Sequence, residues 1–203
     1  DKYGADYVYP PVTTTVPLSD EVQTLLEVYT EGVRDADAML GRLRDSFADR
    51  SEPVVLVFFG DHLPYLGDNQ LGYQELGSPV ALAEEAREDP FCSYETPYVI
   101  WANDAAAELL DWDRAVEALD LPENGTISAS FLGATVLELT GRGEQTPWVA
   151  FLNELRRMAP VVQKKTYMLP DGTYRRPQDP AEDFPNDQQV QDAILQWRQW
   201  SYY

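Results

Sequence analysis

The sequence has very few of the residues that disulfides and zinc sites use. It contains one cysteine, Cys92, and one histidine, His62, among 203 residues. A single cysteine excludes an internal disulfide and any zinc site built from several cysteines. Such low use of cysteine fits a cytosolic protein and an exported bacterial protein equally well.

Basic residues and long apolar runs are also scarce. Fifteen Lys and Arg residues stand against 35 Asp and Glu residues, which gives a formal net charge of -20. This balance argues against binding nucleic acid or an anionic membrane through a basic surface. An anionic substrate would need another source of attraction, and a bound cation is the simplest one. No run approaches 18 apolar residues, so no segment is expected to span a membrane.

The most informative stretch is an apolar run, residues 54–59, that ends in Gly60, Asp61 and His62. Such a run is typical of a parallel strand buried on both faces of an α/β sheet. Gly60 lets the backbone turn, which places an acid and an imidazole at the edge where α/β sheets bind ligands. The alternative is an ordinary turn, in which Asp61 caps and His62 is half-exposed.

Two other segments complete the expected surroundings of this turn. Ser19 is a good N-cap for a long helix whose apolar residues recur every three or four positions, so that one stripe faces the core. Residues 98–102 form a second buried strand, which follows Pro97. Both segments fit an α/β domain.

Residues 65–95, between the two strands, are punctuated by glycine and proline and contain a helix-like acidic segment at 80–88. A long loop directly after Asp61 and His62 is expected to hang over the same edge of the sheet and to shape a site. Tyr65 and Tyr73 are weak candidates for substrate-binding residues in it.

The rest of the chain is expected to be mainly helical, with a small sheet near its end. Proline, aspartate and glycine at 170–172 predict a tight hairpin turn, and a last helix follows. The predicted organisation is a larger portion over 1–159, which the resemblance described below identifies with part of a catalytic domain, and a hairpin-plus-helix subdomain over 160–203. Residues 105–119 are expected to be helical, and 111–113 could divide them. Another helix is expected from Ser128 through Leu139 or Thr140, stopped by Gly141, and a third opens at Thr146 and Pro147 and is ended by Pro160.

The chemical inventory is incomplete for an enzyme. Only two segments have the pattern of buried parallel strands, whereas a sheet usually contains about five or six strands. One Asp-His pair cannot fill the four to six positions around a zinc, magnesium or similar ion. Either the turn is an ordinary one, or the chain is part of a larger active site.

Residues 59–64, Phe-Gly-Asp-His-Leu-Pro, resemble the Gly-Asp-His motif of the lipoteichoic acid synthase-like branch of the sulfatase and alkaline phosphatase superfamily. Tyr29 to Leu43 resemble the family helix that precedes this motif, and Glu95 to Ala102 resemble the strand that follows it. Residues 130–141 and the C-terminal hairpin and helix are also similar to family elements, in the same order. The fold implied is a partial alkaline phosphatase/sulfatase-like sheet with flanking helices.

The resemblance implies a phosphoglycerol transferase-type enzyme that uses a divalent metal. Manganese is typical of the family, while zinc, magnesium and calcium are alternatives. Asp61 and His62 would be metal ligands by the motif match. The metal would polarise a phosphoryl oxygen and lower the pKa of a threonine nucleophile.

The sequence also departs from the family pattern. The threonine nucleophile, a glutamate ligand and a substrate-side histidine are all expected upstream of Asp1, together with the membrane helices. The chain is therefore expected to be inactive alone and to belong to an enzyme on the extracellular face of a bacterial membrane. Its substrate there would be phospholipid-derived or a polyanion of the envelope.

Two alternative functions remain open from the sequence. A sulfatase or phosphoethanolamine transferase could share the Asp-His ligands, and the nucleophile would distinguish it. A non-catalytic module could keep the fold and bind glycan or protein. A sheet edge left open in a partial domain would favour pairing between chains, so a homodimer is a further expectation.

Overall fold

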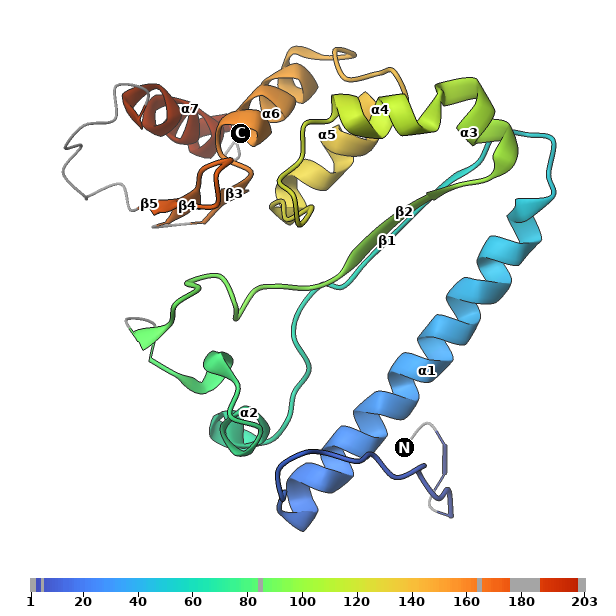
Figure 1. Cartoon of the computed structure of the whole chain (residues 1–203), viewed down its shortest axis with the longest axis vertical. Helices are drawn as coiled ribbons and strands as arrows, with labels where there is room; N and C mark the ends of the chain where they lie inside the picture. The colour runs from blue at the N-terminus through green and yellow to red at the C-terminus, as the bar shows by residue number, and fades with distance from the viewer. Residues whose placement is uncertain (1–2, 5, 84–85, 164–165, 176–186, 201–203) are drawn as a thin grey trace. The chain divides into compact units, whose positions relative to one another are not determined.

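The computed structural model describes residues 3–4, 6–83, 86–163, 166–175 and 187–200 (Figure 1). The chain divides into two compact units, Asp1–Asn103 and Asp104–Tyr203, which are treated one at a time. Helices mix with two small antiparallel sheets, and a C-terminal hairpin sheet and helix are present, which confirms the predicted α/β class. The proposed end subdomain, residues 160–203, lies within the second unit and stays a prediction.

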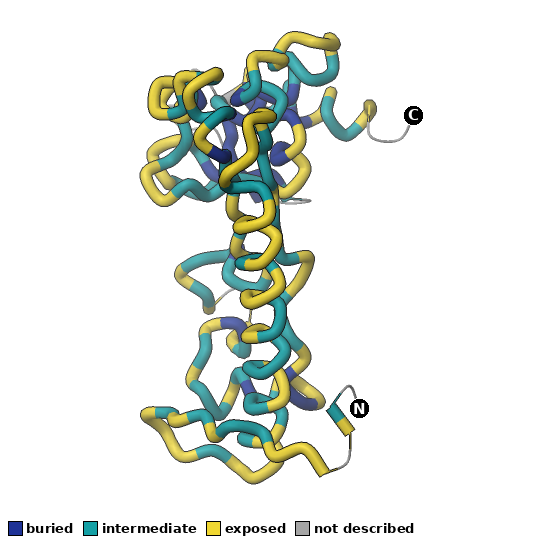
Figure 2. The backbone as a smooth tube through the Cα atoms, turned by 90° about the vertical axis from the view of Figure 1, so that its right-hand side faces the viewer, coloured by how far each residue is buried: buried dark blue, intermediate teal, exposed yellow. Residues whose placement is uncertain are grey.

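The first unit begins with α1, Asp20–Ala48. The hydroxyl of Ser19 accepts a hydrogen bond from the amide of Val22, which confirms the predicted N-cap. The prediction that a full apolar stripe of this helix faces a core is wrong for the described chain. Only Val22 is buried, and the exposed fraction of Val33 is 46%. The tube of the long helix is mostly intermediate or exposed (Figure 2). Periodicity shows which side of a helix is apolar, but it does not show that another element covers that side.

The sheet of the first unit consists of β1, Val55–Phe59, and β2, Tyr98–Ala102. The two strands pair antiparallel, with Val55 opposite Ala102 and Phe59 opposite Tyr98. The prediction of parallel strands buried on both faces is therefore wrong, and Phe59 is 53% exposed. A continuous apolar run identifies a strand, but it carries no information on the direction of its neighbour or on what covers its faces.

A buried asparagine joins the ends of α1, β1 and β2. Asn103 is 1% exposed, and its side-chain amide donates to the carbonyls of Phe47, Arg50 and Glu52 at 3.1, 3.2 and 2.9 Å. Its side-chain oxygen accepts from the amide of Val54 at 3.0 Å. These bonds give the carbonyls at the end of the helix and in the turn that follows a side-chain donor.

The segment between the strands contains α2, Leu71–Glu75, and short 3-10 turns at Asp68–Gln70 and Pro79–Ala81. The helix predicted over 80–88 is wrong for the described residues. The guanidinium of Arg87 donates to the carbonyls of Val80 and Leu82, both at 3.0 Å, and so occupies groups that a helix would use. The segment also buries side chains of its own, Leu66, Val80 and Phe91.

Close packing inside this segment depends on Gly72. A Cβ atom at Gly72 would lie 2.6 Å from both the Cβ and the carbonyl oxygen of Leu66. We expect Gly72→Ala to destabilise the segment by about 1–3 kcal/mol, because the backbone of Leu66 must move. Hydrogen exchange of the amides of residues 66–76 measures this loss.

Gly32→Ala is the matched control for that substitution. Gly32 lies in α1, and an added Cβ meets no atom within 4 Å. This variant should gain roughly 0.5–1 kcal/mol from the higher helix propensity of alanine. Equal effects of the two substitutions would contradict the steric explanation.

The second unit contains five helices and a three-stranded sheet among its described residues. Its core forms where α5, α6, α7 and the sheet meet, around Phe131, Leu155, Tyr167 and Ile194. The predicted break at 111–113 is confirmed, because Asp111 has a positive φ of 51° between two helices. The elements are α3, Asp104–Leu110; α4, Trp112–Ala118; α5, Ala129–Leu139; α6, Pro147–Met158; β3, Val161–Val162; β4, Tyr167–Met168; β5, Tyr174–Arg175; and α7, Asp187–Trp200.

The predicted C-terminal hairpin is confirmed by the pairing of β4 with β5. The amide of Gly172 donates to the carbonyl of Leu169 at 2.9 Å, and Gly172 has φ of 81°, which favours glycine. The amide of Thr173 donates to the carboxylate of Asp171 at 2.8 Å. A hydrogen bond from the Thr173 side chain, together with this backbone bond, lowers the pKa of Asp171. The strand β3 pairs with β4 and extends the hairpin to three strands.

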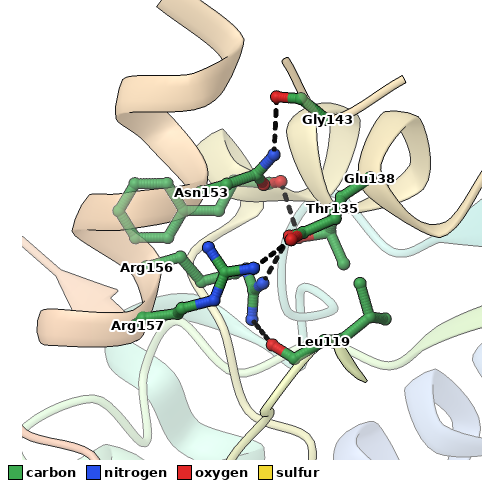
Figure 3. A network of polar contacts seen from close by, with 8 residues as sticks. Leu119, Thr135, Glu138, Gly143, Asn153, Arg156 and Arg157 are labelled. Atoms are coloured by element: carbon green, nitrogen blue, oxygen red, sulfur yellow. Dashed lines mark hydrogen bonds and ion pairs between the residues drawn. The ribbon is translucent and has the colours of Figure 1, made fainter. Parts of the chain in front are cut away.

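A buried ion pair joins α5 to α6 (Figure 3). The Arg156 side chain is 0% exposed and donates to Glu138 at 2.9 Å and to the carbonyl of Leu119 at 2.7 Å. Arg157 shares the same carboxylate from a position that is 38% exposed. Burial lowers the pKa of the Arg156 guanidinium, and the hydrogen bond and charge of Glu138 oppose that effect.

Candidate metal-ligand site

The Gly-Asp-His turn starts where β1 ends and is fixed there by the chain entering β2. The amide of Gly60 donates to the carbonyl of Pro97 at 2.9 Å, and its carbonyl accepts from the hydroxyl of Thr96 at 2.8 Å. A Cβ at Gly60 would lie 3.1 Å from the Cβ of Thr96. Glycine therefore suits this position because two chain segments approach closely, and not because the turn needs a positive φ.

The side chains of Asp61 and His62 lie together and face solvent. They are 81% and 77% exposed, and Nε2 of His62 lies 3.7 Å from Oδ2 of Asp61. The Nδ1 atom of His62 donates to the carbonyl of Leu63 at 2.8 Å. Because a carbonyl can only accept, Nδ1 carries a proton in this contact, and Nε2 is the ring nitrogen on the side of the carboxylate.

This arrangement has the features of two metal ligands from adjacent residues. A metal-bound histidine usually donates its other ring N–H to a carbonyl or carboxylate, and Leu63 supplies that acceptor here. Asp61 adds a negative charge, and its only ion-pair partner among the described residues is His62. The alternative, an ordinary turn capped by Asp61, has no supporting hydrogen bond in the described chain.

The two donors do not form a complete metal site. Among the described residues, no three His, Cys, Asp or Glu side chains are grouped to hold an ion. Asp68, the acid of the following segment that could have added a ligand, instead accepts from the hydroxyl of Tyr65 at 2.7 Å. The residues present fit part of a coordination sphere for a divalent cation, with one anionic oxygen and one neutral nitrogen.

The two candidate tyrosines use their hydroxyls within the chain. Tyr65 is 66% exposed, and its hydrogen bond to Asp68 raises its pKa. Tyr73 is half-buried and donates to the carbonyl of Pro64 at 2.7 Å, and burial raises its pKa. Both phenols therefore stay protonated at neutral pH. Their role in binding a substrate remains a prediction.

Thr96 is the residue near this turn that sequence reasoning missed. It lies 36 positions after Gly60 and meets it only because β1 and β2 pair antiparallel in this register. An expected hairpin between the two strands would have placed residues 96 and 97 beside Gly60. Because parallel strands were expected, this contact was not predicted from the sequence.

Comparison with known proteins decides the family of the chain. Residues 2–142 match the sulfatase family. The chain belongs to the sulfatase family. This result confirms the superfamily part of the predicted resemblance, and it covers the Gly-Asp-His turn and all of the first unit's described elements. The match is to the sulfatase family as a whole, and it does not distinguish the lipoteichoic acid synthase-like branch from other branches.

A relative of this sulfatase-family chain occurs in Rhizobium meliloti (strain 1021) and bears the provisional name cyclic beta-1,2-glucan modification protein. It is 28% identical over 140 residues, which are 68% of this chain and 19% of the relative. The match thus spans about a fifth of the relative's length. No solved structure matches the chain. None of the described helices is long and apolar enough to cross a membrane.

Proposed function

We propose that this chain is the Asp-His ligand-bearing part of a phosphoglycerol transferase-type enzyme, similar to lipoteichoic acid synthases. The observation that carries the proposal is the pair Asp61 and His62 at the end of β1, exposed and 3.7 Å apart in a sulfatase-family sequence. A cation could reach both side chains, because they are 81% and 77% exposed. Asp61 and His62 leave a carboxylate and a ring nitrogen open to solvent.

Each of the two residues has a defined role in this proposal. Asp61 supplies charge to a divalent cation, and His62 supplies a neutral nitrogen whose orientation is set by Leu63. Bound there, the cation would polarise a phosphoryl oxygen and lower the pKa of the nucleophile. Manganese is the metal we propose. The reaction also needs further ligands and a threonine nucleophile, which we propose that another part of the parent enzyme supplies, so we expect the chain alone to be inactive.

The substrates follow from the same chemistry. The donor would be a phospholipid whose head group is phosphoglycerol, presented at the extracellular face of a bacterial membrane. The relative's name supports a glucan hydroxyl as the acceptor class. The chain's net charge of -20 repels an anionic donor, and the cation would offset this locally.

Calorimetric titration of the chain with manganese tests the metal assignment. We expect binding weaker than micromolar, because two protein ligands leave most of the sphere to water. His62→Ala should abolish it, since His62 is the only histidine and supplies the only nitrogen ligand.

Asp68→Asn is the matched control, because Asp68 bonds to Tyr65 and forms no three-donor group with Asp61 and His62 among the described residues. It should bind manganese as the unaltered chain does. Tight binding that Asp68→Asn weakens would mean that the segment after the turn supplies further ligands. Binding that survives in His62→Ala would refute the assignment.

A further inference from the structure

The turn that carries Asp61 and His62 is held at both ends by side-chain hydroxyls. Thr96 donates to the carbonyl of Gly60 at 2.8 Å, and Tyr73 donates to the carbonyl of Pro64 at 2.7 Å. The β1–β2 ladder ends at Phe59, so it does not order the residues between these two carbonyls. The two hydroxyl contacts therefore bracket a five-residue turn in which Asp61 and His62 are exposed and Leu63 and Pro64 are half-buried.

The first contact is anchored in the sheet. Thr96 precedes Pro97, and a residue before proline is restricted to extended backbone. Pro97 accepts the amide of Gly60 at 2.9 Å, so both backbone groups of Gly60 are bound to this dipeptide. Thr96 thus extends the order of the β1–β2 hairpin by one residue into the turn.

The second contact is anchored to the start of α1. Tyr73 lies in α2, whose last residue, Glu75, accepts hydrogen bonds from the amide and hydroxyl of Ser19 at 2.8 and 3.1 Å. Because Ser19 is also the N-cap of α1, the position of α2 is tied to the longest helix of the unit. The far end of the turn is therefore fixed by an element separate from the sheet.

We propose that Thr96 and Tyr73 are positioning residues, which hold the turn so that Asp61 and His62 present their donors together to a metal ion. This inference rests on the proposed function of the pair. A preordered turn loses less conformational freedom when its side chains bind a cation. Removing one hydroxyl bond should weaken manganese binding roughly threefold to tenfold, the usual range for one hydrogen bond.

The single histidine makes the test direct. Carbon- and nitrogen-resolved NMR of the chain contains one set of imidazole signals, from His62. Its metal-free spectrum reports the Nδ1–H tautomer, and its broadening on titration with paramagnetic manganese reports binding. Thr96→Val and Tyr73→Phe each remove one hydroxyl and keep the shape of the side chain.

Matched controls remove the same groups elsewhere in the first unit. Thr24→Val deletes a hydroxyl that donates to the carbonyl of Asp20, and Tyr94→Phe alters a tyrosine that is 69% exposed. Both should leave the tautomer and the broadening unchanged. Thr96→Ser should restore the behaviour of the unaltered chain, because it returns the hydroxyl.

The outcomes separate this inference from the proposed function. Weaker broadening in both hydroxyl variants, with a less populated Nδ1–H tautomer before manganese is added, supports the positioning role. Variants that keep the tautomer and bind manganese within twofold of the unaltered chain overturn it. If manganese broadens no His62 signal in the unaltered chain, the metal assignment fails. The metal-free tautomer then decides whether the two hydroxyls order the turn.

Discussion

Asp61→Asn is expected to lower turnover by roughly a thousandfold in an active protein that contains this chain. A catalytic metal contributes several kcal/mol to transition-state stabilisation, and each 1.36 kcal/mol is a factor of ten. Asparagine keeps the shape of the side chain but removes the negative charge that, in our proposal, holds the cation. The side chain is 81% exposed, so the substitution should leave the fold intact. Release of phosphoglycerol from a lipid donor, at a manganese concentration that just saturates the unaltered protein, measures the effect.

Glu108→Gln provides the control for that loss. It neutralises an exposed acid on α3, inside the residues that match the sulfatase family. This variant should keep at least about half of the turnover, because isolated surface charges contribute little. Recovery of Asp61→Asn activity as manganese is raised would place the defect in affinity for the metal. Normal turnover of Asp61→Asn at limiting manganese would show that Asp61 is not a ligand.

Local signals in the sequence predicted most of the secondary structure. Ser19 caps α1 with its hydroxyl, and Thr146 caps α6 by accepting from the amide of Val149. The turn at residues 170–172 closes the hairpin as expected. Each of these features is decided by residues within a few positions of one another, so one sequence is enough to find it.

Features that depend on distant partners could not be predicted. The direction of β1 relative to β2 depends on how the chain returns through 38 intervening residues, and an apolar run looks the same in either direction. Asn103 reads as an ordinary polar residue after a strand. Its burial follows from three carbonyls more than 50 positions earlier. Propensity and periodicity carry no information on such contacts.

The candidate site was partly predictable for the same reason. Asp61 and His62 are neighbours in the chain, so their proximity needed no tertiary information, and the glycine before them marked the turn. The hydrogen bonds that order the turn became visible only in the structure. They join His62 to Leu63, Tyr73 to Pro64 and Thr96 to Gly60. The sequence therefore predicts which atoms could bind a metal, and the fold adds what holds those atoms in place.

Arg156→Met should destabilise the second unit by about 2–4 kcal/mol. Methionine fills much of the volume of the arginine stem, but it leaves the carbonyl of Leu119 without its donor and Glu138 without its buried partner. Removing one member of a buried polar pair costs the desolvation of the groups that remain. Glu138 keeps Arg157 and is 22% exposed, which limits the loss.

Denaturant unfolding followed by tryptophan fluorescence measures this effect, because Trp112, Trp148, Trp197 and Trp200 all lie in the second unit. Arg157→Met is a close control, since Arg157 contacts the same carboxylate from a position that is 38% exposed. Its cost should stay below about 1 kcal/mol, as for other exposed ion pairs. If both substitutions lowered the free energy of unfolding equally, burial of Arg156 would not explain its contribution to stability. A neutral Arg156→Met would mean that the desolvation of the guanidinium offsets all that its hydrogen bonds contribute.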